Sequence, residues 1–339
     1  MKCLPKFFTG RNKPGYGVVL LFFTITFFLA VIASLLFGSV PLTLQDLLSA
    51  PSNDAIRRIL LHVRLPRTLA AALAGVALAS SGAIIQSVMG NPLAGPNLIG
   101  VNSGAGLAAV VCAAFLPGVP GVMTTGAFLG ALGAMLLIYS VARATGASRI
   151  TLVLAGIAVS NILSAGIDTV VTLVPDALMG ISAFRIGTLE NAAMDKLYLP
   201  AVYIAVGLIL AFFLCNEMDV LALGEETARS LGLNTKRYRF WLLLTAAMLA
   251  GAAVSFCGLL GFVGLIVPHA ARFLVEGESK RLLPVSALAG GTFVLLCDVL
   301  ARVLFAPYEI PVGIIMSYLG GPFFLWLLIR KKGGRSSND

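Results

Sequence analysis

The sequence is built from long apolar runs that carry almost no charge, and this feature limits the possible folds more than any other. A helix needs about 20 apolar residues to cross the hydrocarbon core of a bilayer, and the runs have that length. They are continuous, whereas the strands of an outer-membrane barrel alternate apolar and polar residues. Only 12% of the residues are charged, against about 25% in soluble domains. With a mean hydropathy of +0.96, this composition excludes a soluble enzyme and predicts an all-α polytopic membrane protein.

The runs predict ten transmembrane helices. The stretch 240–274 is too long for one helix and barely long enough for two, so we divide it near Cys257. With ten spans and a cytoplasmic N-terminus, most Lys and Arg residues fall on the cytoplasmic side, as the positive-inside rule requires, whereas nine spans would place the basic cluster 330–332 outside. The predicted helices are 18–38, 66–88, 96–115, 121–142, 151–173, 197–215, 238–257, 259–275, 283–304 and 311–330.

The same division predicts the organisation of the chain. We expect a cytoplasmic segment at 1–17, one transmembrane domain over 18–332 and a cytoplasmic tail at 333–339, with a long inner loop at about 217–237. The chain is then a multi-pass membrane protein with both termini in the cytoplasm.

An internal repeat divides the ten helices into two halves. Gly75, Gly82 and Pro92 recur as Gly251, Gly258 and Pro268, each displaced by the same number of residues. The two copies lie five helices apart, an odd number, so the halves have opposite orientations, as in many transporters. Chance spacing among 36 glycines is the alternative.

One predicted helix, 151–173, carries a polar stripe. Ser160, Ser164, Asp168 and Thr172 are four residues apart and share a helical face, with Asn161 beside it. Such a stripe either lines a water-filled path through the membrane or forms hydrogen bonds between helices.

The chain shows no catalytic, cofactor or metal motif. It lacks a Walker phosphate loop and an HExxH motif, and its five cysteines occur singly. The energy for transport must then come from a partner or from an ion gradient. An ion-coupled transporter needs ionisable groups near mid-membrane, yet Asp168 lies near the outer end, and Asp298 and Arg302 are one turn apart and can pair. The net charge of +9 does not indicate nucleic acid, because the basic residues lie between apolar runs.

Two further segments lie at the membrane surfaces. Arg64 and Arg67 are at the outer mouth of the second helix, where arginine opposes the positive-inside bias, so we expect an acidic partner surface or lipid head groups to receive them. The inner turn 91–96 has two prolines and almost no charge, and it is either a gate or a short connection.

The inner loop predicts a short helix. Gly224 precedes it and Gly232 ends it, and Ala228, Leu231 and Leu233 would form an apolar patch facing the cytoplasm. A cytoplasmic partner could bind this helix; an interfacial helix lying on lipid is the alternative.

These segments, in this order, resemble the FecCD permease family, the membrane subunits of type II ABC importers for ferric siderophores, haem and cobalamin. The matching stretches are RLPRTLAAALAGVALASSGAIIQSVMGNPLAGPNLIGVNSGAG (64–106), LALGEETARSLGLN (221–234), GLLGFVGLIVPHAARFL (258–274) and DVLARVLFAPYEIPVGIIMSYLGGPFFLWLLIRKK (298–332). The similarity runs from about residue 40 to residue 332.

The resemblance implies a permease of two inverted five-helix halves that pairs as a homo- or heterodimer and encloses the path at the dimer interface. Two cytoplasmic subunits would hydrolyse ATP with Mg, and an extracytoplasmic binding protein would deliver the substrate. Arg64, Arg67 and Arg302 would receive its glutamates, and Asn91 and Leu93 would form the cytoplasmic gate. The helix at 151–173 would line the path. The residues implied in ATPase coupling are Gly224, Glu225, Glu226, Ala228, Arg229, Leu231 and Gly232.

We therefore expect a permease of a bacterial inner-membrane ABC importer that moves an iron-siderophore-type chelate inward, without enzymatic activity of its own. A haem or cobalamin importer, an ion-coupled secondary transporter and a membrane-embedded enzyme are the alternatives. The segment 184–189 departs from the tryptophan-containing stretch common in the family, so the substrate cannot be carried over. The turn 148–151 also differs, and we assign no gate residue there.

Overall fold

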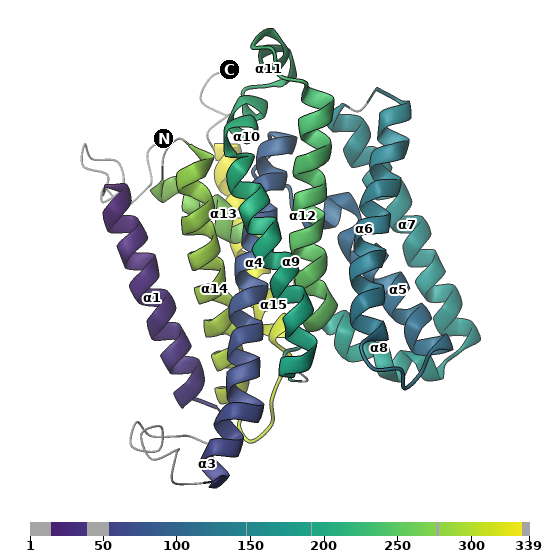
Figure 1. Ribbon diagram of the computed structural model, residues 1–339, viewed down its shortest axis with the longest axis vertical. Coiled ribbons are helices and arrows are strands. Elements are labelled where there is room, and N and C mark those ends of the chain that lie inside the picture. The colour runs from purple at the N-terminus through teal and green to yellow at the C-terminus, as the bar shows by residue number, and fades with distance from the viewer. Residues whose placement is uncertain (1–14, 39–53, 147, 191, 276–277, 334–339) are drawn as a thin grey trace.

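The computed structural model describes residues 15–38, 54–146, 148–190, 192–275 and 278–333, and every regular element within them is helical (Figure 1). A π-helical turn, Leu60–Arg64, precedes α4, and a 3₁₀ turn, Pro96–Ile99, precedes α5. The α-helices are α1 Tyr16–Leu36, α3 Asp54–Ile59, α4 Leu65–Met89, α5 Val101–Phe115, α6 Val122–Ala144, α7 Arg149–Leu173, α8 Asp176–Ile186, α9 Met194–Phe213, α10 Cys215–Ala222, α11 Glu225–Ser230, α12 Thr235–Cys257, α13 Val263–Leu274, α14 Ser279–Val303 and α15 Val312–Gly333.

Each of the ten predicted spans contains an apolar helix. Seven helices of the described residues are long and apolar enough to cross a membrane, and three shorter apolar helices lie in α5, α13 and α15. α5 is shorter than predicted because Gly100, at a φ of +73°, separates it from the 3₁₀ turn. The long stretch divides as expected, since α12 ends at Cys257 and Gly258 follows at a φ of +71°.

Three helices were not predicted. α3 extends α4 outward through the π-helical turn, α8 follows α7, and α10 precedes α11 in the inner loop. These helices have 6, 11 and 8 residues, too few for a span. A search of the sequence for apolar runs long enough to cross a membrane therefore does not detect these three helices.

α4 and α12 form the centre of the bundle, where small residues bring helix backbones close together. A Cβ on Gly75 would lie 2.2 Å from the carbonyl oxygen of Gly290 in α14, and a Cβ on Gly82 would lie 1.8 Å from that of Gly264 in α13. In the second half, a Cβ on Gly251 of α12 would lie 2.9 Å from Ala131 of α6. α4 thus packs on the ninth span and α12 on the fourth, which are equivalent positions in two inverted five-helix halves.

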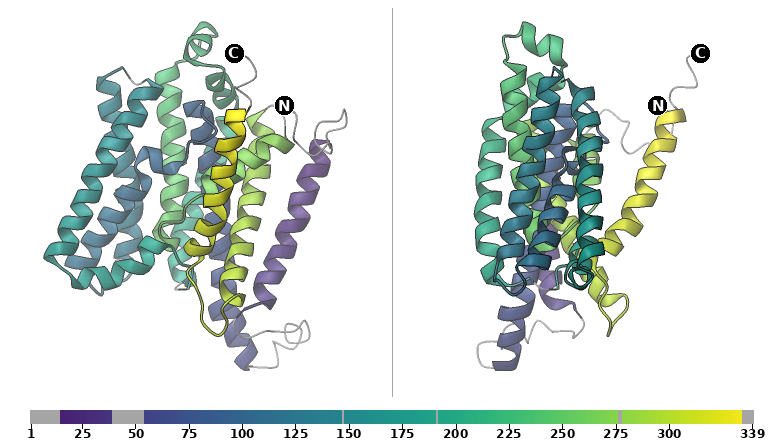
Figure 2. Two further views of the ribbon diagram at one scale, coloured as in Figure 1. Left: turned by 180° about the vertical axis from the view of Figure 1, so that it is seen from behind. Right: turned by 90° about the vertical axis from the view of Figure 1, so that its right-hand side faces the viewer.

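The bundle has two distinct ends (Figures 1 and 2). We call them the α11 end, where α10 and α11 lie, and the α3 end, where α3 lies. The start of α1 and the end of α15 are both at the α11 end, as an even number of spans requires (Figure 2). The chain ends 1–14 and 334–339 are outside the described residues, so the predicted segments 1–17 and 333–339 are untested apart from the start of α1 and the end of α15.

Candidate functional site

One face of α7 is exposed along its whole length and changes character halfway. Its first half is apolar, and the side chains of Ile150, Leu154 and Ile157 are 72%, 61% and 51% exposed. Its second half is polar, and the spacing of three and four residues keeps all these positions on one face. The exposed polar residues of that half are Asn161, Ser164, Asp168 and Thr172.

A hollow of about 300 Å³ lies beside the polar half of this face, between α5, α7 and α8. Ser160 and Ser164 line it together with Asn102, Ser103 and Arg185. Ser103 donates a hydrogen bond of 3.1 Å to the hydroxyl of Ser160, so Ser160 both joins two helices and faces the hollow.

Three other residues of the predicted stripe do not line this hollow. Asn161, Asp168 and Thr172 are exposed on α7 itself, and the Thr172 hydroxyl donates 2.7 Å to the Asp168 backbone carbonyl. An exposed carboxylate on a membrane helix is costly in lipid but not in water, so Asp168 favours an aqueous surface beside this half of α7.

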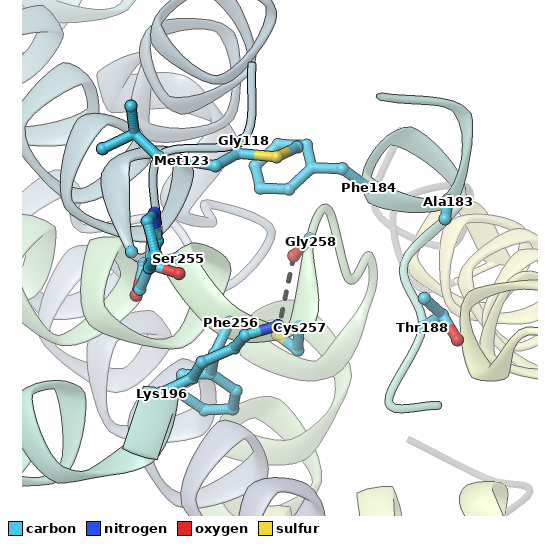
Figure 3. Close-up of a pocket in the computed structure, with 14 residues that line it drawn as sticks. Gly118, Met123, Ala183, Phe184, Thr188, Lys196, Ser255, Phe256, Cys257 and Gly258 are labelled. Atoms are coloured by element: carbon cyan, nitrogen blue, oxygen red, sulfur yellow. Dashed lines mark hydrogen bonds between the residues drawn. The ribbon is translucent and has the colours of Figure 1, made fainter. Parts of the chain in front are cut away.

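A second hollow, of about 400 Å³, lies at the α3 end and is shown in Figure 3. Its walls come from the α5–α6 connection, α8, the start of α9 and the end of α12, and Lys196 is its cationic side chain. Ala183 and Phe184 of α8 line it, whereas Ile181 and Arg185 of α8 line the first hollow. α8 is therefore the wall between the two, and the segment 184–189, which departs from the family stretch, begins in this wall.

The turn after α4 lies against the apolar half of α7. Gly90, at a φ of +60°, ends α4, and the Leu93 amide donates 3.0 Å to the Asn91 side-chain oxygen. Asn91 lines a hollow of about 270 Å³ with Leu154 and Arg149 of α7, while Leu93 does not line it.

Arg149 connects α7 to two other elements, and sequence reasoning assigned it no role. One guanidinium nitrogen donates 2.7 Å to the Leu221 carbonyl of α10, and a Cβ on Gly90 would lie 2.3 Å from the other. A cation in the first turn of a long helix opposes the helix dipole, so it needs acceptors from elsewhere. The position of Arg149 at the start of a long helix was therefore the one feature of the sequence that could have indicated a contact with another segment.

The inner loop contains the predicted short helix, which is α11. The apolar patch predicted on its outward side, however, has a different composition. Ala228 is fully buried, so it cannot belong to a patch that faces outward. The exposed apolar side chains are Leu231, at 63%, and Leu223 before the helix, also at 63%. Position 228 turns inward because the helix must bury one apolar side against the bundle. Glu226, Arg229 and Gly232 are exposed, and Gly224 precedes the helix at the N-cap position.

Polar contacts fasten α10 and α11 to the bundle. Glu225 accepts hydrogen bonds of 2.5 Å from Arg229 and 2.9 Å from the fully buried Arg239 of α12. Burial raises the pKa of the Glu225 carboxyl, but the two guanidiniums outweigh it and hold this pKa below its ordinary value. The carboxylate of Asp219 in α10 accepts 2.9 Å from the Ser279 amide at the start of α14.

The three arginines predicted to dock a partner are buried together at the α3 end. Arg67 pairs with Asp298 at 2.9 Å and with Glu309 at 2.5 Å. Arg302 pairs with Asp298 at 2.9 Å, which confirms the pairing expected one turn apart. Arg64 donates 2.7 Å to the Leu36 carbonyl. The chain itself therefore supplies partners for these cations, and their predicted role in docking stays a prediction.

Comparison with known proteins shows which family has this architecture. A sequence profile of the FecCD transport family matches residues 25–330. The hemin transport system permease protein HmuU of Yersinia pestis is 37% identical over 333 residues, 96% of this chain and 99% of HmuU. The Fe(3+) dicitrate transport system permease protein FecD of Escherichia coli is 34% identical over 318 residues, 93% of this chain and 99% of FecD.

Solved structures agree. One described as an inward-facing conformation of a metal-chelate type ABC transporter matches with a TM-score of 0.82 at 28% identity, over 93% of this chain and 99% of that one. The family that the sequence motifs resemble is thereby confirmed: the chain is an integral membrane protein and belongs to the FecCD transport family.

Proposed function

We propose that this chain is the permease subunit of an ABC importer that moves an iron chelate inward by alternating access. Relatives of high coverage are named as permeases for hemin and for ferric dicitrate, which supports both the class of protein and an iron-containing cargo. The chain has no Walker phosphate loop, so ATP hydrolysis with Mg belongs to two partner ATPase subunits. It carries no cofactor of its own in this proposal.

The exposed face of α7 is the observation that carries the proposal. Its polar half would be costly against lipid, and its apolar half is too exposed for the interior of the single chain. A second permease, identical or related, placed against this face would enclose a path with polar walls at Asn161, Ser164, Asp168 and Thr172. The hollow beside Ser160 would then open into that path.

The gate lies where this face becomes apolar. Ile150 and Leu154 of two protomers would meet there and exclude water, and the rigid turn with Asn91 and Leu93 packs behind them. A rigid turn moves as one unit when the helices shift, which suits a gate.

Coupling to the ATPases would run through α10 and α11. Their exposed side carries Glu226, Arg229 and Leu231, which suits a cytoplasmic partner better than lipid. Their inner side is bonded to three spanning helices: α12 through Arg239, α14 through Ser279 and α7 through Arg149. A displacement of this segment would therefore reach the path-lining helix directly.

Docking of an extracytoplasmic binding protein would use the arginine cluster at the α3 end. Three arginines face two carboxylates there, Asp298 and Glu309, which leaves one positive charge in excess. A glutamate of the binding protein would be attracted to that charge and would compete with Glu309 for Arg67.

In this proposal the α11 end lies in the cytoplasm and the α3 end lies outside. Both chain termini are then cytoplasmic in the inner membrane of a bacterial cell. Within the family, haem and cobalamin are the alternative substrates to a siderophore-type chelate.

Reconstitution in lipid vesicles tests the proposal. We expect uptake of a ferric chelate only when the permease, its ATPase subunits, the binding protein and ATP are all present. Uptake driven by a proton or sodium gradient through the chain alone would contradict it and establish an ion-coupled transporter instead. Supplying ferric citrate, a hydroxamate chelate, hemin and cobalamin in parallel identifies the substrate.

A further inference from the structure

A basic groove lies outside the path, the gate and the coupling segment. It occupies about 570 Å³ between the end of α6 and the start of α12, at the α11 end. These two helices lie side by side in Figure 1 and are packed against each other. We call this space the α6–α12 groove.

The α6–α12 groove gathers positive charge from both helices. Arg143 comes from the last turn of α6, and Lys236 and Arg237 come from the first turn of α12. All three side chains are exposed, no Asp or Glu lines the groove, and none of the three forms an ion pair within the described residues. The N-terminal end of the α12 dipole is offset by the C-terminal end of the α6 dipole, so the three side chains supply the positive field. An anion is the ligand that such a field favours.

The walls of the groove are rigid and amphipathic. The Tyr139 hydroxyl donates 2.9 Å to the Lys236 carbonyl, which ties α6 to α12, and its ring lies 5.0 Å from that of Phe240. Below the basic residues the wall becomes apolar. Leu136, two turns before Arg143 on the same face of α6, lines the groove and is 45% exposed, and Phe240 of α12 lines it as well. Trp241, which is 43% exposed, lies next to this wall, with its ring 5.6 Å from that of Phe240. A charged mouth above an apolar wall matches a molecule with a charged head and a hydrocarbon tail.

We infer that the α6–α12 groove binds an anionic phospholipid of the cytoplasmic leaflet. Its phosphate lies between Arg143 and Lys236, and an acyl chain lies along Leu136 and Phe240, beside Trp241. A soluble phosphate compound leaves the apolar wall unused, and a zwitterionic lipid brings a cation of its own to the basic mouth. Basic pockets between transmembrane helices on the cytoplasmic side are typical of head-group recognition. The assignment to that leaflet rests on the orientation given under the proposed function.

Tryptophan quenching by brominated lipid tests this inference on the full-length chain in neutral detergent. The chain has two tryptophans, so Trp326→Phe leaves Trp241 as the reporter. We expect brominated phosphatidylglycerol to quench Trp241 at a much lower concentration than brominated phosphatidylcholine. The double variant Arg143→Gln/Lys236→Gln should weaken the phosphatidylglycerol response by about thirtyfold, the effect of two basic residues near a membrane surface.

A matched control removes the same charges from the same end of the bundle. Lys280 and Arg281 are exposed at the start of α14. Lys280→Gln/Arg281→Gln should keep the phosphatidylglycerol response of the parent chain, and equal melting temperatures show that both double variants are folded.

Three outcomes would overturn the inference. These are equal responses to the two lipids, an equal loss in the control variant, and displacement of the brominated lipid by glycerol 3-phosphate, which would indicate a soluble phosphate ligand. ATP-driven uptake is measured separately. A failure of uptake with the lipid preference intact counts against the proposed function alone, and a lost preference with intact uptake counts against this inference alone.

Discussion

α4 and α7 are the same length and almost equally apolar, yet they occupy opposite environments. Each has 25 residues, and the mean hydropathy of the best window is 1.9 for the helix that contains α4 and 2.0 for α7. Of those windows, 78% is buried inside the single chain for α4 and 22% for α7. Hydropathy therefore predicts that a helix crosses the membrane, but it does not predict what the helix contacts there.

The difference comes from side-chain size and from the position of polar groups. α4 carries small residues on several sides, so α12, α13 and α14 can all approach its backbone. α7 carries large apolar residues and then polar ones on one exposed face, which no other part of the described chain covers. Small residues on several sides are typical of a helix packed within the chain. An exposed face that is apolar and then polar is typical of a helix that contacts a second subunit and water.

The largest expected effect is in α4. Gly82→Ala places a methyl group 1.8 Å from a backbone oxygen of α13, so the helices must separate. We expect a loss of about 3 kcal/mol in stability, the upper part of the usual range for overpacking, measured by denaturation in detergent. The control is Gly133→Ala in α6, where nothing lies within 4 Å and helix propensity should add up to about 1 kcal/mol. Equal effects at the two positions would show that α4 is not closely packed.

A substitution on the exposed face of α7 should change the rate of uptake and leave the stability of the chain unchanged. Ser164→Phe narrows the proposed path, and we expect the initial rate of ATP-driven uptake to fall about tenfold, or ~1.4 kcal/mol. The stability of the chain should stay within about 0.5 kcal/mol because the site is exposed. Ile162→Phe, 70% exposed on another face, is the control and should transport normally. Equal loss of uptake in both variants would remove the polar face from the path.

Arg149 joins the exposed helix to the loop that we propose the ATPases contact. Arg149→Lys keeps the charge but cannot reproduce the planar guanidinium that reaches both Leu221 and Gly90. We expect a loss of about 1 kcal/mol in stability, together with more ATP hydrolysed for each substrate imported. The ratio of hydrolysis to uptake is the measurement, and an unchanged ratio would exclude Arg149 from coupling.

The expected effect on stability at Glu225 is no larger than that at Arg149, and it depends on pH. The arginines hold its folded-state pKa below the ordinary value, so its contribution to stability is present above the unfolded-state pKa of about 4.3 and is lost as the pH falls through the folded-state value. Glu225→Gln should therefore cost roughly 1 kcal/mol at pH 7, since the carboxyl is partly exposed, and progressively less below pH about 4. Melting curves of the two proteins across that range measure this, and a constant difference would contradict the role of the charge.

The sequence was most informative where one physical requirement dominates. Span length predicts all ten apolar helices, and Gly258 divides the long run because a glycine with a positive φ ends the helix there. The polar stripe on α7 also follows from spacing alone, since four-residue intervals define a face.

Contacts between distant segments could not be predicted in the same way. Arg67 meets Asp298 and Glu309 across more than 230 positions, so the arginines at the outer mouth looked unpartnered in sequence. Ala228 looked exposed because a short helix has too few residues for its buried side to be read from periodicity. α8 was passed over for its length, although it forms the wall between two hollows.

Cysteine accessibility along α7 tests the central claim most directly. In a chain without its five native cysteines, single cysteines at 161, 164, 168 and 172 would be treated with a membrane-impermeant thiol reagent in assembled transporter, with Ile162→Cys for comparison. We expect reaction at the four polar positions, slowed by bound substrate, and none at position 162. Equal protection of all five positions would place this face against lipid or protein and would contradict a water-filled path.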